Sequence, residues 1–159
     1  MSTEGLSCVL LADRHHGLSE GVRGLLETEF AVVVMVADET SLLEGAKRLR
    51  PTLAVADLSL SRSESLKWIT SLRSDDPDLK VIVLSVHDEP SVCRCALEAG
   101  VDGFVLKRDI ATELLQAVGV VIAGKRYISS GALDRMSPAE RAAHDNGSNE
   151  THKVAEEPP

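Results

Sequence analysis

Basic residues are in the minority in this sequence, which has 17 Lys and Arg against 25 Asp and Glu and a formal net charge of -8. Because the phosphate backbone of a nucleic acid binds to positively charged protein surfaces, we expect no direct nucleic-acid recognition. No apolar stretch reaches the roughly 20 residues that a membrane-spanning helix needs. Residues 1–4 lack a basic segment followed by an apolar one, so no export signal is predicted. We therefore expect a cytoplasmic protein whose partner is another protein.

Cysteine is also scarce, with three residues in the whole chain. Cys8 lies in the first apolar run, whereas Cys93 and Cys95 lie two positions apart in a predicted helix and point to nearly opposite sides of it. A disulfide or a metal site needs side chains on a shared face, so we interpret all three as free thiols.

Short apolar runs alternate with segments whose apolar residues recur at helical spacing, a pattern typical of βα units around a parallel sheet. Five runs rich in Val, Leu and Ala are predicted strands: 8–12, 31–36, 53–56, 80–84 and 103–106. Helices are predicted at 18–26, 40–49, 65–73, 90–99 and 110–122. We expect an α/β fold, a doubly wound parallel sheet of five strands in the order 2-1-3-4-5 with helices on both faces.

The length of 159 residues and the hydrophobic content of 43% fit one globular domain with a modest tail. We expect a short N-terminal extension over 1–6 and a domain over 7–133. Apolar periodicity fades in the last part of the chain, which ends in Glu-Glu-Pro-Pro. An unstructured tail is therefore predicted over 134–159.

Polar side chains stand at the ends of four predicted strands, where the loops of an open parallel sheet form its binding crevice. They are Asp13, Asp57, Ser85 and Lys107. A carboxylate can attack phosphorus, while a hydroxyl and an ammonium group can hold the oxygens of a transferred phosphoryl group. Exposure of loops to water would explain any one of these residues, but it explains four together poorly. The four residues therefore predict a site that handles phosphoryl groups.

Several segments resemble the receiver domain of two-component response regulators, in particular the NarL/FixJ type, over about residues 7–133. They are VLLAD at 9–13, EGVRGLL at 20–26, VLSVHD at 83–88, ALEAG at 96–100 and GFVLK at 103–107. The resemblance implies a flavodoxin-like (βα)5 fold and a phosphorelay in which a histidine kinase or phosphotransfer protein is the donor. It implies a signalling domain rather than an enzyme.

The resemblance also implies a role for each residue of the predicted site. Asp57 matches the phosphoacceptor, Asp13 an acid that binds Mg²⁺, Ser85 the switch hydroxyl, Lys107 the partner of the phosphate and Phe104 the switch aromatic. In such a switch, the hydroxyl and the aromatic side chain move on phosphorylation and change the surface near the fourth helix and fifth strand.

Arg14 departs from the receiver pattern, because typical receivers have a second acid there that touches the metal. A guanidinium group cannot bind a cation, so we expect Mg²⁺ binding to be weak or absent. In one interpretation, Arg14 turns to solvent and leaves a weak site made by Asp13, Asp57 and the backbone carbonyl of Ser59. In the other, Arg14 pairs with Asp57 or Asp13 and takes the place of the cation.

The loop after Asp57 is a second departure, since it reads LSRSES at 60–65 where receivers usually have Met-Pro-Gly and a further Gly. Without Pro to fix φ and Gly to allow positive φ, the loop should be more mobile or differently shaped.

Three histidines, His15, His16 and His87, lie near the same edge. We interpret them as loop histidines rather than ligands of a transition metal.

The function that we expect is that of an atypical single-domain receiver, which accepts phosphate on Asp57 weakly or conditionally and signals by protein contact. One alternative is a pseudo-receiver scaffold that works without phosphorylation. A remote alternative is a phosphatase of the haloacid dehalogenase type. That enzyme needs an aspartate two residues after the nucleophile as general acid, and Ser59 stands there.

Receivers of this type normally continue into a helix-turn-helix domain that binds DNA. MSPAER at 136–141 faintly resembles the opening of that domain, but no helical apolar pattern follows it. The sequence leaves open a stand-alone receiver or a part of a longer protein.

The last predicted helix also carries apolar residues, Val118, Val121 and Ile122, beyond what one sheet face requires. A weak homodimer through this helix is therefore expected.

Overall fold

Runs of buried apolar residues form a parallel sheet in the computed structural model, which describes residues 7–61, 63 and 65–144. The strands are β1 (Cys8–Ala12), β2 (Val32–Val36), β3 (Leu53–Asp57), β4 (Lys80–Ser85), β5 (Gly103–Leu106) and β6 (Tyr127–Ile128). Their order across the sheet is β2-β1-β3-β4-β5-β6, and every neighbouring pair is parallel. Both faces of the central strands are covered, which explains why these strands are continuous apolar runs.

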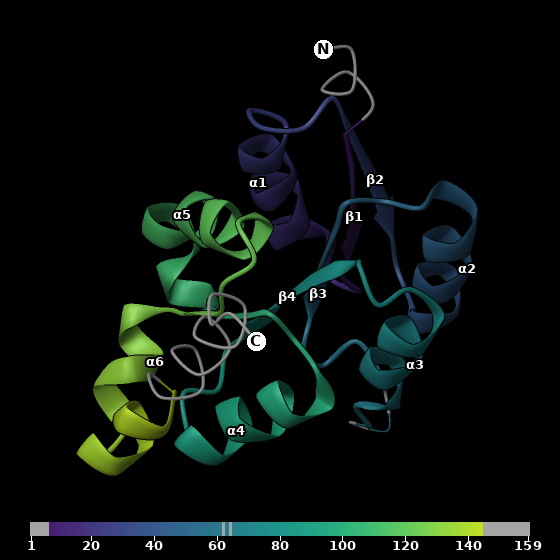
Figure 1. Cartoon of the computed structure of the whole chain (residues 1–159). Coiled ribbons are helices and arrows are strands. Elements are labelled where there is room, and N and C mark those ends of the chain that lie inside the picture. The colour runs from purple at the N-terminus through teal and green to yellow at the C-terminus, as the bar shows by residue number, and fades with distance from the viewer. Residues whose placement is uncertain (1–6, 62, 64, 145–159) are drawn as a thin grey trace, which may run out of the picture.

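Helices cover the two faces of the sheet, as Figure 1 shows. They are α1 (His16–Leu26), α2 (Glu39–Leu49), α3 (Lys67–Asp75), α4 (Pro90–Ala99), α5 (Ile110–Ile122) and α6 (Ser130–Arg135), with a 3-10 turn at Lys107–Asp109. One hydrophobic cluster joins α1 and α5 to their face, and a second joins α2, α3, α4 and α6 to the other. The predicted doubly wound α/β fold is therefore confirmed.

The predicted number of five strands is wrong, because β6 adds a sixth strand at the edge of the sheet. β6 pairs with β5 through Gly103 opposite Tyr127 and Phe104 opposite Ile128. A strand of two residues has no run of apolar side chains in the sequence, so periodicity does not reveal it. The pairing holds the start of α6 against the end of β5.

The ordered part of the chain also continues beyond the expected domain end. Residues 134 and 135 complete α6, and residues 138–144 form a further helix, whereas this stretch was expected to begin an unstructured tail. The extension expected over 1–6 and the rest of the expected tail, 145–159, lie outside the described residues.

Local chemistry sets the helix boundaries. The Asp38 side chain caps α2 by accepting a hydrogen bond from the Ser41 N–H at 2.7 Å. Pro90 is the first residue of α4, and Gly100 ends that helix with a left-handed φ of 115°.

Within the described residues, no helix has the length and apolar character needed to cross a membrane.

The cysteine side chains lie in different environments, and all three are free thiols. Cys93 is buried, Cys95 is exposed on the opposite side of α4, and Cys8 is partly buried in β1. The described residues contain no group of three or more His, Cys, Asp or Glu side chains arranged to hold a metal ion.

Candidate functional site

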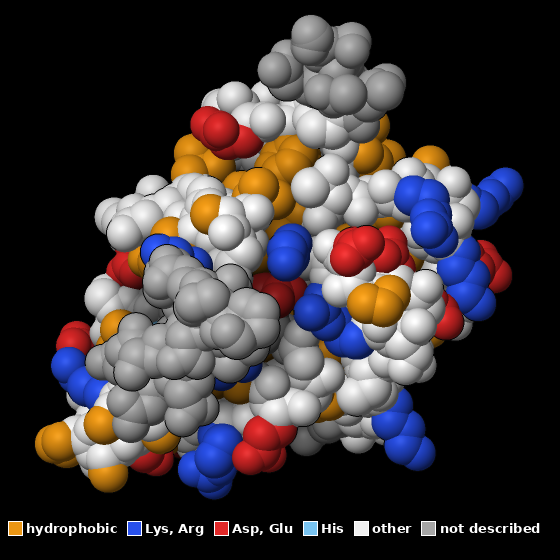
Figure 2. Space-filling model, viewed as in Figure 1, with side chains coloured by type: hydrophobic (Ala, Val, Ile, Leu, Met, Phe, Trp, Pro, Cys, Tyr) orange, Lys and Arg blue, Asp and Glu red, His pale blue; other side chains and the backbone are white. Residues whose placement is uncertain are grey.

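The predicted site residues come together at the carboxyl end of the sheet. Asp57 is the last residue of β3 and Ser85 the last of β4, while Asp13 and Lys107 directly follow β1 and β5. Because the strands are parallel, their carboxyl ends share one edge, which brings these four positions into one crevice. Figure 2 shows acidic and basic side chains side by side near the middle of one face of the molecule.

Asp57 is held on both of its carboxylate oxygens. The Lys107 ammonium group donates to Oδ2 at 2.7 Å. The backbone N–H and the hydroxyl of Ser59 both donate to Oδ1 at 2.9 Å. The Asp57 residue is only 3% exposed, so these partners replace most of its contact with water.

The environments of the two aspartates shift their pKa values in opposite directions. Burial raises the pKa of Asp57, but the hydrogen bonds from Lys107 and Ser59 outweigh it and leave the pKa lowered. Burial also raises the pKa of Asp13, and the hydrogen bond from the His15 N–H at 2.8 Å does not offset it. The negative charge of Asp57 raises the pKa of Asp13 further. Asp57 is thus an ionised carboxylate at neutral pH, which is the form that can act as a nucleophile.

The Ser85 hydroxyl is engaged with its own loop. It donates to the His87 carbonyl at 3.0 Å and accepts from the His87 N–H at 2.9 Å. Ser85 also lines a hollow of about 380 Å³ beside Asp57. The other lining residues are Leu58, Ser59, Leu66, Val86, His87, Ser91, Val92 and Cys95. The hollow gives room beside Asp57 for added atoms.

Phe104 lies in the hydrophobic core rather than in the crevice. It is fully buried in β5 and belongs to the cluster that also holds α4 and α6. Its position connects the interior of the sheet with the helices that cover this face.

Arg14 forms no ion pair with Asp13 or Asp57, all three of which lie in the described part of the chain. The interpretation in which Arg14 pairs with an aspartate is therefore not the arrangement found. Lys107 instead contacts Oδ2 of Asp57, and the backbone N–H of His15 contacts Asp13. Arg14, which is partly exposed, instead lines a separate hollow with residues of the β2–α2 loop and of the segment after β3.

Two histidines near the crevice make no metal site with the aspartates. His15 is exposed and contributes its backbone N–H to Asp13. His87 is also exposed, and its ring lies 3.9 Å from Glu89.

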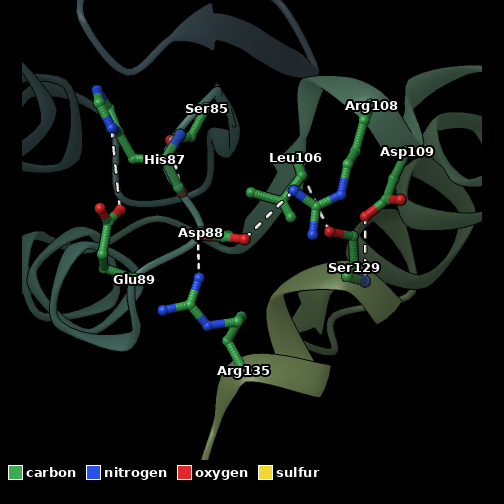
Figure 3. A network of polar contacts seen from close by, with 10 residues as sticks. Ser85, His87, Asp88, Glu89, Leu106, Arg108, Asp109, Ser129 and Arg135 are labelled. Carbon is green, nitrogen blue, oxygen red and sulfur yellow. Dashed lines mark hydrogen bonds and ion pairs between the residues drawn. The ribbon is translucent and has the colours of Figure 1, made fainter.

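Sequence reasoning missed a polar network next to the crevice, which Figure 3 shows. Asp88 accepts from Arg108 at 3.3 Å and from Arg135 at 2.6 Å. These partners are 20 and 47 positions away in the sequence, so no local spacing signals the contacts. Sequence reasoning also did not foresee that the Ser59 hydroxyl donates to Oδ1 of Asp57.

Comparison with known families gives a match between residues 9–119 and the response regulator receiver domain. The chain belongs to this family. A putative transcriptional regulator of Pseudomonas aeruginosa is 34% identical to the receiver over 137 residues, which are 86% of this chain and 66% of that protein. The nitrate/nitrite response regulator NarP of Escherichia coli is 31% identical over 123 residues, 76% of this chain and 57% of that protein. NarP is named as a response regulator, and response regulators are signalling rather than catalytic proteins.

Solved structures agree with this assignment of the receiver. The isolated receiver domain of RcsB from Salmonella enterica serovar Typhimurium, with the phosphomimetic BeF3-, has a TM-score of 0.73 and 26% identity, covering 82% of this chain and 99% of that one. A LuxR-family response regulator from Aurantimonas sp. SI85-9A1 has a TM-score of 0.72 and 26% identity, with coverage of 89% and 96%. The receiver spans about half to two thirds of the length of the curated relatives that it matches.

Proposed function

We propose that this receiver accepts a phosphoryl group on Asp57, weakly or conditionally, and signals through contacts with other proteins. The observation that carries the proposal is the ionised Asp57 carboxylate at the carboxyl end of β3, held by Lys107 at 2.7 Å. A phosphorylated histidine of a kinase or phosphotransfer protein is the donor. A carboxylate oxygen attacks phosphorus, the P–N bond breaks, and its electron pair stays on the imidazole nitrogen, which takes up a proton.

The residues around Asp57 suit this transfer. The Lys107 ammonium group can move from the Asp57 carboxylate to an oxygen of the incoming phosphoryl group. Ser85 lines the hollow beside Asp57, where its hydroxyl can reach another of these oxygens. Mg²⁺, when bound, neutralises charge on a phosphoryl group in transfer. Asp13, Asp57 and the backbone carbonyl of Ser59 are the groups that would hold it. The raised pKa of Asp13 fits such a role, because a cation would relieve the repulsion between the two carboxylates.

Three features support weak rather than efficient phosphorylation. The oxygens of Asp57 already accept three hydrogen bonds, which draw electron density from the carboxylate and make it a weaker nucleophile. Arg14 adds positive charge where receivers usually carry a second acid. The loop after β3 also lacks the Pro and Gly residues that usually shape it.

Protein contact, in the cytoplasm, is the output that we propose. One of the similar structures contains two RcsB dimers bound to two parallel DNAs, which is a property of that protein. The full chain of 159 residues carries a formal net charge of -8, which opposes DNA binding by the chain itself.

Self-association through the end of α5 has less support than the sequence suggested. Val118 is 5% exposed and Val121 is fully buried, because both pack against the sheet with the rest of the core. Only Ile122 of these three side chains is available at the surface, at 42% exposed. A homodimer, if formed, would need other residues of this surface.

Mass spectrometry after incubation with a small phosphodonor tests the proposed function. We expect slow addition of one phosphoryl group to the wild type and none to Asp57→Asn. Asp78→Asn, which changes an exposed aspartate away from the site, should behave as the wild type does. If neither the small donor nor a histidine-phosphorylated phosphotransfer protein modifies Asp57, the pseudo-receiver scaffold replaces the proposal. Hydrolysis of a chromogenic phosphate ester should be absent, and its presence would indicate the phosphatase instead.

A further inference from the structure

Asp88 lies between two arginines that come from different parts of the chain, as Figure 3 shows. It stands in the β4–α4 loop, while Arg108 precedes α5 and Arg135 ends α6. The two guanidinium groups contact different oxygens of Asp88, at 3.3 Å from Arg108 and 2.6 Å from Arg135. The Asp88 side chain is 21% exposed, whereas those of Arg108 and Arg135 are 57% and 51% exposed, so only the carboxylate is partly shielded from water and each ion pair is individually weak. We call these three residues the Asp88 clamp.

The clamp is connected to the phosphoacceptor site from two sides. Arg108 directly follows Lys107, whose ammonium group binds Asp57. Asp88 directly follows His87, whose backbone carbonyl and N–H both bind the Ser85 hydroxyl. Lys107 and Ser85 are thus each separated from a residue of the clamp by a short stretch of backbone.

Arg135 joins the clamp to the end of α6, whose beginning is fixed independently. Ser129 is fully buried, and its hydroxyl accepts from the Leu106 N–H at 3.0 Å. The Gly131 N–H donates to Asp109 at 3.1 Å. Ala132 is 1% exposed in the core. These contacts keep the first turn of α6 in place whether or not Arg135 is held.

The chain after α6 is held mainly by α6 itself: Arg141 donates to the Leu133 carbonyl at 3.0 Å and pairs with Asp134 at 3.6 Å, and Met136 packs against the core. Its contacts with α4 are fewer. Ser137 and Glu140 cap the helix at 138–144 by reciprocal hydrogen bonds, at 2.8 Å and 3.2 Å. Glu140 reaches α4 through a long ion pair with Arg94 at 3.8 Å. A hollow of about 360 Å³ remains between this helix and α4. It is lined by Pro90, Arg94, Leu97, Glu98, Arg126, Ile128, Met136, Glu140, Ala143 and His144.

We propose that residues 136–144 are a cover over α4 and β6, that the Asp88 clamp keeps this cover closed, and that phosphorylation of Asp57 opens it. The proposal rests on the proposed function, because its trigger is the phosphoryl group. Residues 137–144 seat over a hollow and lose little packing when they leave, whereas Met136 gives up its contact with the core. Opening exposes the surface of α4 around Pro90 and Leu97 together with Ile128 of β6.

The physical cause is competition for donors. A phosphoryl group on Asp57 carries about -1.5 to -2 charges and three strong acceptor oxygens, and because it replaces the charge of the carboxylate the crevice gains roughly one negative charge. These oxygens draw the Ser85 hydroxyl away from the His87 carbonyl and draw the Lys107 ammonium group outward. Both shifts move the backbone next to Asp88 and Arg108, and the contact with Arg135 is lost. The two states differ in which acceptors the same donors bind.

Hydrogen exchange of the amides in residues 136–144 tests the cover, with Asp57 phosphorylation followed by mass spectrometry in the same samples. The Arg141 N–H, bonded to the Ser137 carbonyl at 3.0 Å, is one of the protected amides that report on it. In unphosphorylated protein we expect Arg135→Ala to speed this exchange by about two- to fivefold, as suits loss of a partly exposed ion pair. Phosphorylation should speed exchange in the wild type by at least as much, and should add little in Arg135→Ala.

Two controls separate the clamp from a general loss of charge or stability. Arg135→Lys keeps the charge and should restore most of the protection. Arg48→Ala removes an equal charge from α2, where Arg48 forms no ion pair with the described residues, and should leave exchange unchanged. Exchange in residues 127–132 should stay constant throughout, because their anchors do not involve Arg135.

Each outcome decides between the two proposals. Equal exchange in the wild type and Arg135→Ala overturns the clamp. A phosphorylated wild type with unchanged exchange overturns the cover but leaves the proposed function intact. Failure of every donor to modify Asp57 overturns the proposed function and the trigger together.

Discussion

The Lys107 ammonium nitrogen lies 2.7 Å from Oδ2 of Asp57, which is 50 positions earlier in the chain. The side chains of Lys107 and Asp57 are 17% and 5% exposed, so little water remains to stabilise either charge alone. A buried ion pair stabilises a fold little more than well-packed apolar side chains in its place would. Removal of one partner, however, leaves the other as a buried charge without compensation, which is strongly destabilising. The stability of the site therefore depends on both residues together.

Lys107→Ala should lower the free energy of unfolding by about 1–3 kcal/mol at neutral pH, because it leaves the Asp57 carboxylate buried without its cation. It should also raise the pKa of Asp57. Urea denaturation and an NMR titration measure the two effects. Lys47→Ala, which breaks an exposed ion pair with Asp75 at 3.8 Å, is the matched control and should cost much less. Equal losses in the two variants would contradict the argument.

Asp13→Asn should stabilise the receiver near pH 7. The folded state raises the pKa of Asp13, so keeping this carboxyl ionised costs free energy at neutral pH. The cost disappears below the unfolded pKa of about 3.9, where both states are protonated. We expect a gain of roughly 0.5–1.5 kcal/mol at pH 7 that fades as the pH falls. Thermal unfolding between pH 3 and pH 7 measures it, and the surface variant Asp78→Asn should show no such trend.

Arg14→Asp should increase Mg²⁺ affinity about tenfold or more and speed phosphorylation of Asp57. Two unit charges ~4 Å apart at an effective dielectric constant near 20 interact by about 4 kcal/mol before solvation reduces it. Calorimetric titration of Mg²⁺ and the rate of phosphorylation are the measurements. Arg14→Ala separates the two causes, since it removes the repulsion without adding a ligand. The prediction fails if the wild type binds Mg²⁺ as tightly as Arg14→Asp.

Ser59→Ala should speed phosphorylation of Asp57 by about two- to fivefold. The variant removes the hydroxyl that donates to Oδ1 at 2.9 Å, while the Ser59 N–H remains, so this oxygen becomes a better nucleophile. The pKa of Asp57 should rise at the same time, which a purely structural effect would not require. Ser74→Ala, on the exposed side of α3, is the control. A rate equal to or below that of the wild type would show that the hydroxyl does not restrain Asp57.

The main strands and the crevice follow from the sequence because they rest on local chemistry. Leu53 to Ala56 are apolar and small, as a strand covered on both faces requires, and Asp57 marks its end. β6 does not follow, since two residues carry no periodicity and the strand exists through its pairing with β5. The direction of Arg14 does not follow either, because it depends on the Lys107 side chain, 93 positions later, occupying the Asp57 carboxylate in the complete fold.

The exposure of a single side chain and an ion pair between residues far apart in the sequence also cannot be predicted from the sequence alone. Val121 looks like one residue of an apolar stripe, but the packing of α5 against the sheet buries it fully. The contact between Asp88 and Arg135 joins residues 47 positions apart, and only the complete sheet brings them together.

The distance of 50 residues between Asp57 and Lys107 also sets an order for the folding of the site. During synthesis the chain emerges from its N-terminus, so β1, β3 and β4 can associate before β5 is made. Until β5 joins β4, the Asp57 carboxylate has no ammonium partner, and closing this long loop is among the slower contacts to form. A nascent or clipped chain that ends before β5 therefore lacks the ammonium group that holds Asp57 in the complete fold, and we expect it to compete poorly with finished receivers for a phosphodonor.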